Sequence, residues 1–117
     1  MGYSAARAEQ TAWVRRAATN FVGDELAGNG AGVCAILNAP LRFSTHRHTC
    51  AQRWDARLAQ MLHEPGARAK LRAQRHAIAA AAVAVHGDSA SIQLSSPLLS
   101  DPANHFLWTE NCWMLEG

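Results

Sequence analysis

The chain has 117 residues and a formal net charge of +2, and hydrophobic residues make up 49% of it, with four Trp and three Phe among them. This composition is typical of one globular domain and excludes an intrinsically disordered chain. The ten Arg and one Lys are spread along the sequence. A nucleic-acid-binding domain would cluster them, so we expect no nucleic-acid partner. The longest apolar run, residues 77–85, is too short for a transmembrane helix of ~20 residues, so we expect no integral membrane segment.

The first predicted element is an amphipathic helix over residues 5–27, with Ser4 as its N-cap. Trp13, Ala17 and Phe21 recur every four residues, which is the spacing of one apolar helix face. The sequence GNG that follows contains two glycines and ends the helix in a turn.

Two more helical segments follow. Residues 31–37 form a short helix, and a loop then leads to a third helix that begins after Thr49. Thr49 and Gln52 have the spacing of a capping box, in which each side chain accepts a hydrogen bond from a backbone N–H at the helix start. The third helix breaks at a Pro-Gly pair and resumes over residues 67–75.

The rest of the chain has the alternation of apolar and polar residues that is typical of strands. AAVAVHGDSASIQL alternates on both sides of a His-Gly-Asp turn, which predicts an antiparallel hairpin. The alanine-rich residues 76–82 before it fit either a strand or an extension of the helix. HFLWTENCWMLEG predicts a second hairpin that turns at Glu110 and Asn111. The sequence therefore predicts helices followed by antiparallel strands.

Three local features together resemble those of a known family. They are CAILNAP at 34–40 with TCAQRW at 49–54, VAVHGDSASIQL at 83–94, and FLWTENCWMLE at 106–116. With helices first and hairpins after them, the chain resembles the nuclear transport factor 2-like (ketosteroid-isomerase-like) superfamily, and in particular its small exported actinobacterial members. The likeness covers residues 5–116, so we expect one domain over 1–117.

The resemblance implies an α+β fold in which three N-terminal helices pack on a strongly curved antiparallel sheet, as a cone-shaped, cystatin-like roll. It also implies a pocket inside the cone. Enzymes of this superfamily place Asp, His, Tyr or Arg in that pocket, whereas the only tyrosine of this chain, Tyr3, lies outside the expected core.

Cys34 and Cys50 bracket a loop that also holds His46 and His48, and three interpretations fit this arrangement. A metal site needs thiolates and imidazoles that converge, but the chain lacks the CxxC pair typical of structural zinc. A catalytic cysteine has its pKa lowered by a helix N-terminus, which fits Cys50 near His48. A disulfide would close the loop between two helices.

We expect the disulfide, and neither a metal nor a cofactor. Closing a loop of this length stabilises a fold by about 3 kcal/mol, and the similar exported proteins also carry cysteines around this loop. The bond favours an oxidising compartment, so we expect an exported or cell-envelope protein whose leader has been removed. If Cys34 and Cys50 are not bonded, a cytoplasmic location is expected instead. Cys112 is then the odd cysteine, expected as a buried or half-buried free thiol.

Asp24 and Glu25 lie near the end of the first helix, where a negative charge opposes the helix dipole. One of them is therefore expected to have another role. Asp24 is our candidate for a catalytic acid or base, together with His86 in the first hairpin turn. Most of the six histidines are expected to be surface residues.

Five residues are candidates for lining a mainly apolar ligand pocket between the first helix and the sheet: Trp13, Ala17, Phe21, Trp54 and Trp108. Small side chains beside large ones leave either a solid core or a void, and a dry apolar void binds apolar guests. The tryptophans suit a solid core as well. Asp24 or Glu25 is expected near the rim of the pocket.

These features predict a non-enzymatic exported or envelope-associated domain that binds an apolar small molecule or a protein partner in or around the cone. The alternative is a small-molecule lyase or isomerase of the ketosteroid-isomerase type, with Asp24 or a histidine as its acid or base. The sheet is also expected to offer a surface through which two copies form a homodimer.

Overall fold

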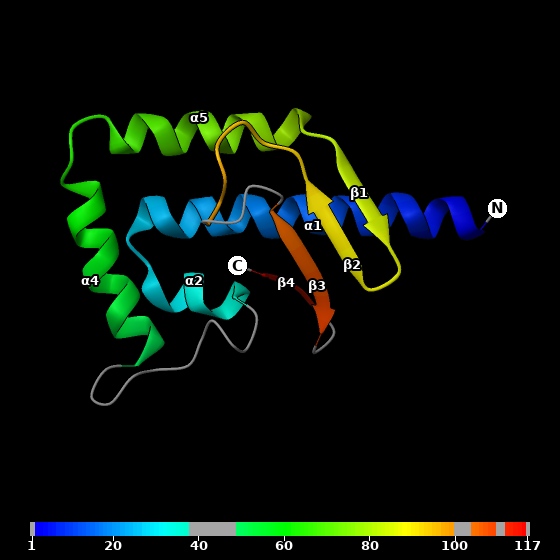
Figure 1. The fold of residues 1–117 in the computed structure, drawn as a ribbon, viewed down its shortest axis with the longest axis horizontal. Helices are drawn as coiled ribbons and strands as arrows, with labels where there is room; N and C mark the ends of the chain where they lie inside the picture. Colours follow the sequence, from blue (N-terminus) through cyan, green and yellow to red (C-terminus); the bar gives the residue numbers. More distant parts are fainter. Residues whose placement is uncertain (1, 38–48, 100–103, 110–111, 117) are drawn as a thin grey trace.

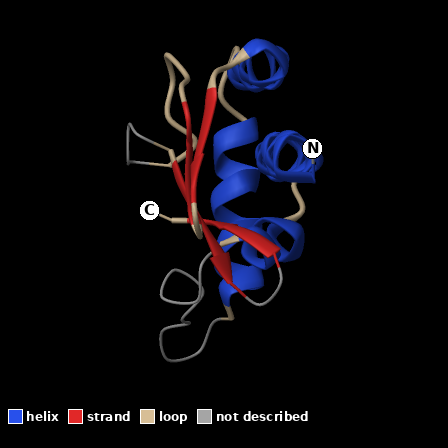
Figure 2. Cartoon of the chain, turned by 90° about the vertical axis from the view of Figure 1, so that its right-hand side faces the viewer, coloured by secondary structure: helices blue, strands red, loops and turns tan. Residues whose placement is uncertain are grey.

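The computed structural model describes residues 2–37, 49–99, 104–109 and 112–116, and in this part of the chain the helices precede the strands. The helices are α1 (Gly2–Ala27), α2 (Gly30–Ile36), α4 (Cys50–Leu62) and α5 (Ala67–Ala80). The strands are β1 (Val83–His86), β2 (Ser89–Ile92), β3 (His105–Thr109) and β4 (Cys112–Leu115). They form one antiparallel sheet in the order β1-β2-β3-β4, with the helices on one side of it (Figure 1, Figure 2).

Helix α1 runs through the middle of the helical layer, between α5 and α2 (Figure 1). Its fully buried side chains recur every three or four positions and form one apolar face: Val14, Ala18, Phe21 and Val22. The helix begins at Gly2, so Ser4 lies inside it and our prediction of Ser4 as the N-cap was wrong. It ends at Ala27 as predicted, because Gly28 adopts a φ of 68°, a conformation that glycine adopts without strain.

Helix α2 is fixed to α4 by a disulfide between Cys34 and Cys50, whose Cα atoms are 6.1 Å apart. The predicted bond is therefore present. The two backbones also approach closely, because the Gly30 N–H donates a hydrogen bond to Asp55 Oδ1 at 2.7 Å. A Cβ atom at Gly30 would collide with the Ala51 carbonyl oxygen, so only glycine allows this contact.

Both of these helices begin at a capping side chain. Asn29 Oδ1 accepts a hydrogen bond from the Gly32 N–H at 3.0 Å, and α2 begins at Gly30, one residue earlier than predicted. At the start of α4, Thr49 Oγ1 accepts from the Gln52 N–H at 3.2 Å, and Gln52 Oε1 accepts from the Thr49 N–H at 2.9 Å. This reciprocal pair confirms the predicted capping box.

Helix α5 is longer than the predicted segment 67–75, because most of the alanine-rich stretch after it is also helical. Arg15 of α1 binds the end of this helix. Its Nε donates to the Ile78 carbonyl at 3.2 Å, and its Nη2 donates to the Ala81 carbonyl at 2.9 Å. These carbonyls lie at a helix end, where the regular intrahelical bonds stop, and the Ile78 carbonyl also accepts from the Ala81 N–H at 3.3 Å. The arginine therefore stabilises the point at which the helix gives way to β1.

The two hairpins pair as predicted. β1 and β2 join at a turn where Gly87 has a φ of 60°, and Ile92 of β2 is fully buried. β3 and β4 pair with Trp108 opposite Trp113. The turn predicted at 110–111 lies outside the described residues.

These elements confirm the α+β class and the antiparallel sheet. We predicted three helices, but the described residues form four, because the break at Pro65 and Gly66 separates two full helices, α4 and α5. None of the helices in the described ranges is long and apolar enough to cross a membrane.

Cys112 is exposed, which corrects our expectation of a buried or half-buried thiol. We therefore expect one reactive thiol per chain before reduction, both in the folded protein and in denaturant, and three after reduction, since the chain has three cysteines. A chromogenic thiol reagent measures both counts, and Cys112→Ser should bring the first count to zero. Three thiols before reduction would disprove the disulfide.

Replacing Arg15 tests its role at the end of α5. Arg15→Gln should lower the free energy of unfolding by about 1–3 kcal/mol, because two carbonyls lose a charged donor. Urea unfolding measures the change. Arg16→Gln is the matched control, because Arg16 is the exposed neighbour on the same helix, and equal losses in both variants would contradict the assignment.

Candidate functional site

A cleft of about 1070 Å³ opens where the end of α1, α4, α5 and residues 96–99 meet. The large apolar residues that line it are Leu37, Trp54, Met61, Leu71, Leu98 and Leu99. The charged residues that line it are Glu25, Arg53, Arg57, Glu64 and Lys70. No residue of the described strands lines it, so it lies elsewhere than the pocket that we predicted between the first helix and the sheet.

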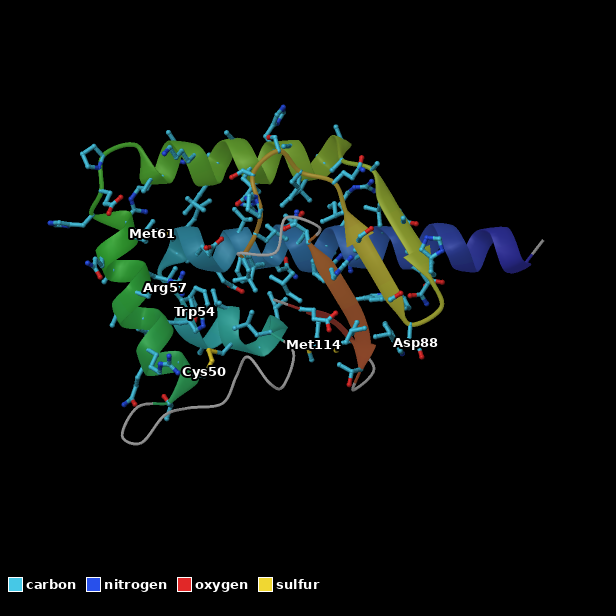
Figure 3. The ribbon with its side chains drawn as sticks, in the orientation of Figure 1. Cys50, Trp54, Arg57, Met61, Asp88 and Met114 are labelled. Carbon is cyan, nitrogen blue, oxygen red and sulfur yellow. A yellow bond between two sulfur atoms is a disulfide. The ribbon has the colours of Figure 1, made fainter. Side chains whose placement is uncertain are left out.

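Helix α4 presents one row of side chains to the cleft. Cys50, Trp54, Arg57 and Met61 follow one another at helical spacing on the side of α4 that faces the rest of the molecule (Figure 3). The Trp54 ring meets Phe21 of α1 edge-on, with centroids 6.4 Å apart and planes at 81°. The Arg57 guanidinium carbon lies 4.9 Å from the centre of the Trp54 ring. Trp54 therefore joins the core to the cleft and holds Arg57 by a cation–π interaction.

Residues 96–99 form another wall, and hydrogen bonds from Asn104 and Gln74 fix their position. Asn104 is 1% exposed, and its Oδ1 accepts from the Leu98 N–H at 2.7 Å. Its Nδ2 donates to the Ile92 carbonyl of β2 at 3.3 Å. Gln74 of α5 donates to two carbonyls of the segment, at 2.9 and 3.2 Å. The wall is therefore held by both the sheet and α5.

Glu25 is the unusual residue of the cleft. It follows Phe21 by one helical turn on the buried face of α1, and it is only 6% exposed. Its Oε1 is buried and has no hydrogen-bond partner among the described residues. Burial raises the pKa of this carboxyl to about 7, and the positive charge of Arg57 limits the rise. The pKa of Glu25 therefore lies near neutral pH, the range in which a general acid or base works best.

The two predicted acid or base candidates lie outside the cleft. Asp24 is half-buried beside Gly32 of α2. The pKa of its carboxyl is raised by burial, and a hydrogen bond with Asn29 limits this rise. His86 is exposed at the end of β1. Of the two acids that we expected near a pocket rim, Glu25 is the one that lines the cleft.

Of the five predicted pocket residues, the structure places Trp54 in the cleft and the other four elsewhere. Phe21 is fully buried, and Ala17 is half-buried against the core. Trp13 and Trp108 stack on each other with ring centroids 6.0 Å apart and planes at 13°. Trp108 also meets Trp113 of β4 edge-on, with centroids 5.4 Å apart, so these rings form an aromatic cluster separate from the cleft.

Arg57 is a residue of the cleft that was not predicted from the sequence. An arginine on the polar side of an amphipathic helix is ordinary, so its residue type carries no signal. The spacing could have predicted its contact with Trp54. Arg57 follows Trp54 by three positions, and residues at this spacing lie side by side on a helix.

The described residues contain no group of three or more His, Cys, Asp or Glu side chains that could hold a metal ion. His46 and His48 of the hypothetical metal site lie outside the described residues. Cys50 is bonded to Cys34 and has no free thiolate, which excludes the catalytic-cysteine interpretation.

Comparisons with protein-family models, with curated proteins and with solved structures gave no match to this chain. Its function is therefore inferred from the cleft.

The raised pKa of Glu25 makes stability depend on pH. Because the folded protein holds this proton more tightly than the unfolded chain, where the pKa has its ordinary value of 4.5, stability should fall as pH rises from 4.5 to about 7. We expect the free energy of unfolding to fall by about 2–3 kcal/mol between pH 5 and pH 8 from this group. Glu25→Gln should remove this part of the fall and be more stable than the parent at pH 8.

Urea unfolding at both pH values provides the measurement. Glu9→Gln, at an exposed glutamate of the same helix, is the control and should keep the slope of the parent. The same slope in Glu25→Gln as in the parent would show that Glu25 does not titrate in this range.

Proposed function

We propose that this chain is a non-enzymatic binding domain whose cleft holds a small, largely apolar molecule. The observation that carries the proposal is Glu25, a buried carboxyl that lines the open cleft and has an oxygen with no hydrogen-bond partner in the described part of the chain. Leaving a buried polar group unpaired costs about 1–3 kcal/mol. Such a cost is expected where the group meets a ligand, since binding sites combine apolar walls with a few polar groups.

The size of the cleft favours a small molecule over a protein partner. Pockets for small molecules span about 300–1,000 Å³, and the volume of this cleft, about 1070 Å³, is slightly above that range. A protein partner would instead need a broad surface of about 800 Å² on each side.

We also propose that the chain is a member of the nuclear transport factor 2-like superfamily and that its helices and sheet form the cone of that fold. The order of elements supports this, because the helices come first and pack on one side of an antiparallel sheet (Figure 2). The Cys34–Cys50 bond supports an exported or cell-envelope location. A homodimer would use the face of the sheet that no described helix covers (Figure 2).

A lyase or isomerase is the second candidate, and the pKa of Glu25 favours it. A carboxyl that titrates near pH 7 can take a proton from a carbon atom and return it elsewhere. Arg57 in the same cleft would stabilise the negative charge that develops on the substrate. Deuterium exchange at the α-carbon of 2-decanone, followed by NMR and abolished by Glu25→Gln, would support an enzyme. No acceleration over buffer would leave the binding function.

A neutral apolar fluorophore tests the binding function. N-phenyl-1-naphthylamine should bind the parent protein with an increase in its fluorescence. Ala67→Phe should weaken this binding at least ten-fold, because Ala67 is half-buried and lines the cleft. Ala69→Phe is the matched control, since Ala69 is exposed on the same helix and outside the cleft, and it should bind as the parent does. Equal binding by both variants would place the probe elsewhere.

A further inference from the structure

The charged side chains that line the cleft include more cations than acids. Arg53, Arg57 and Lys70 line it, and Glu64 is the only acid there besides Glu25 among the described residues. Positive charges therefore outnumber negative ones whether Glu25 is protonated or ionised. A cationic ligand would be repelled by this wall, whereas an anionic one would be attracted.

Arg57 is positioned to bind an anion. Its guanidinium is held at the cleft wall over Trp54, at 4.9 Å from the ring centre. Among the described residues it donates no hydrogen bond to the protein. Its five N–H donors in a planar fork match the oxygens of a carboxylate or a phosphate.

We propose that the cleft binds an amphipathic anion, with its charged group at Arg57 and its apolar body against Trp54 and Leu98. This inference rests on the proposed binding function and specifies the chemical class of the ligand. Glu25 of α1 lines the same cleft. In its neutral form it adds no negative charge beside the anion and has a proton to donate to an oxygen of the ligand.

The charges around Glu25 link binding to protonation. They come from α1, α4, α5 and the turn between the last two helices: Asp24, Arg53, Arg57, Glu64, Arg68, Lys70 and Arg75. Neither α2 nor residues 96–99 carry a charged side chain. An anion at Arg57 offsets the positive charge that lowers the pKa of Glu25, so binding favours protonated Glu25. By reciprocity, protonated Glu25 favours the anion.

Three ligands with alkyl groups of the same length test which charge the cleft prefers: decanoate is an anion, 1-decanol is neutral and decylammonium is a cation. Isothermal titration calorimetry at pH 6 should show one decanoate per chain, bound at least ten-fold more tightly than either of the others. Arg57→Gln should weaken decanoate binding at least ten-fold and weaken 1-decanol binding much less, because the alcohol carries no charge. Arg57 is exposed, so the variant should keep the thermal unfolding of the parent.

Arg72→Gln is the matched control, because Arg72 is exposed on α5 and does not line the cleft. It should bind decanoate as the parent does. Between pH 6 and pH 8 the parent should lose affinity for decanoate, and Glu25→Gln should lose less. An equal loss of affinity in both proteins would show that Glu25 does not take part in decanoate binding.

Equal affinities for decanoate and 1-decanol, with no effect of Arg57→Gln, would overturn this inference and leave the apolar binding function standing. Tighter binding of decylammonium would overturn it as well, because Glu25 would then be the group that selects the ligand. If decanoate, 1-decanol and N-phenyl-1-naphthylamine all fail to bind, the proposed function and this inference both fall.

Discussion

Burial of one face of α1 is the constraint on which the rest of the described structure depends. α5 and α2 pack on this helix within the helical layer, and β1, β2 and β4 pack on it from the sheet. Val14, Phe21 and Val22 are fully buried there, and each such side chain contributes about 1.5–3 kcal/mol. Glu25 continues the same face and interrupts its apolar character where the cleft opens. Stability and the proposed function are therefore opposed at this position, since an apolar residue would be buried without the cost of desolvating a carboxyl.

The wall of the cleft is held before any ligand arrives. The Cys34–Cys50 bond ties the first turn of α4 to α2, and Leu37, just after α2, forms a β-bridge with Leu115 of β4. The helix that carries Arg57 is therefore linked covalently to an element that also contacts the edge of the sheet. Because these groups are already ordered, binding loses less conformational entropy than it would at a mobile surface.

Features that depend on a few neighbouring residues were predictable from the sequence. The capping box of Thr49 and Gln52 forms because two side chains and two backbone N–H groups lie within one helical turn. Gly28 and Gly87 end a helix and close a hairpin because glycine adopts positive φ without strain. The hairpins could also be predicted from their alternating apolar and polar residues, because successive strand residues point to opposite faces of the sheet.

Features that depend on distant residues were decided only by the tertiary structure. The alanine-rich end of α5 has no apolar periodicity, and Arg15 of α1 binds the carbonyls where this helix stops. Trp13 and Trp108 were expected to line a pocket with Trp54, but packing stacks them on each other outside the cleft. The sequence by itself determined the order of the elements, the capping box of α4 and the hairpins. Glu25 follows Phe21 by four residues, the spacing of one helix face, so this pattern favours Glu25 over Asp24 as the buried acid. Only the tertiary structure decided that a cleft opens at Glu25, because α4, α5 and residues 96–99, which form that cleft with α1, are distant in the sequence.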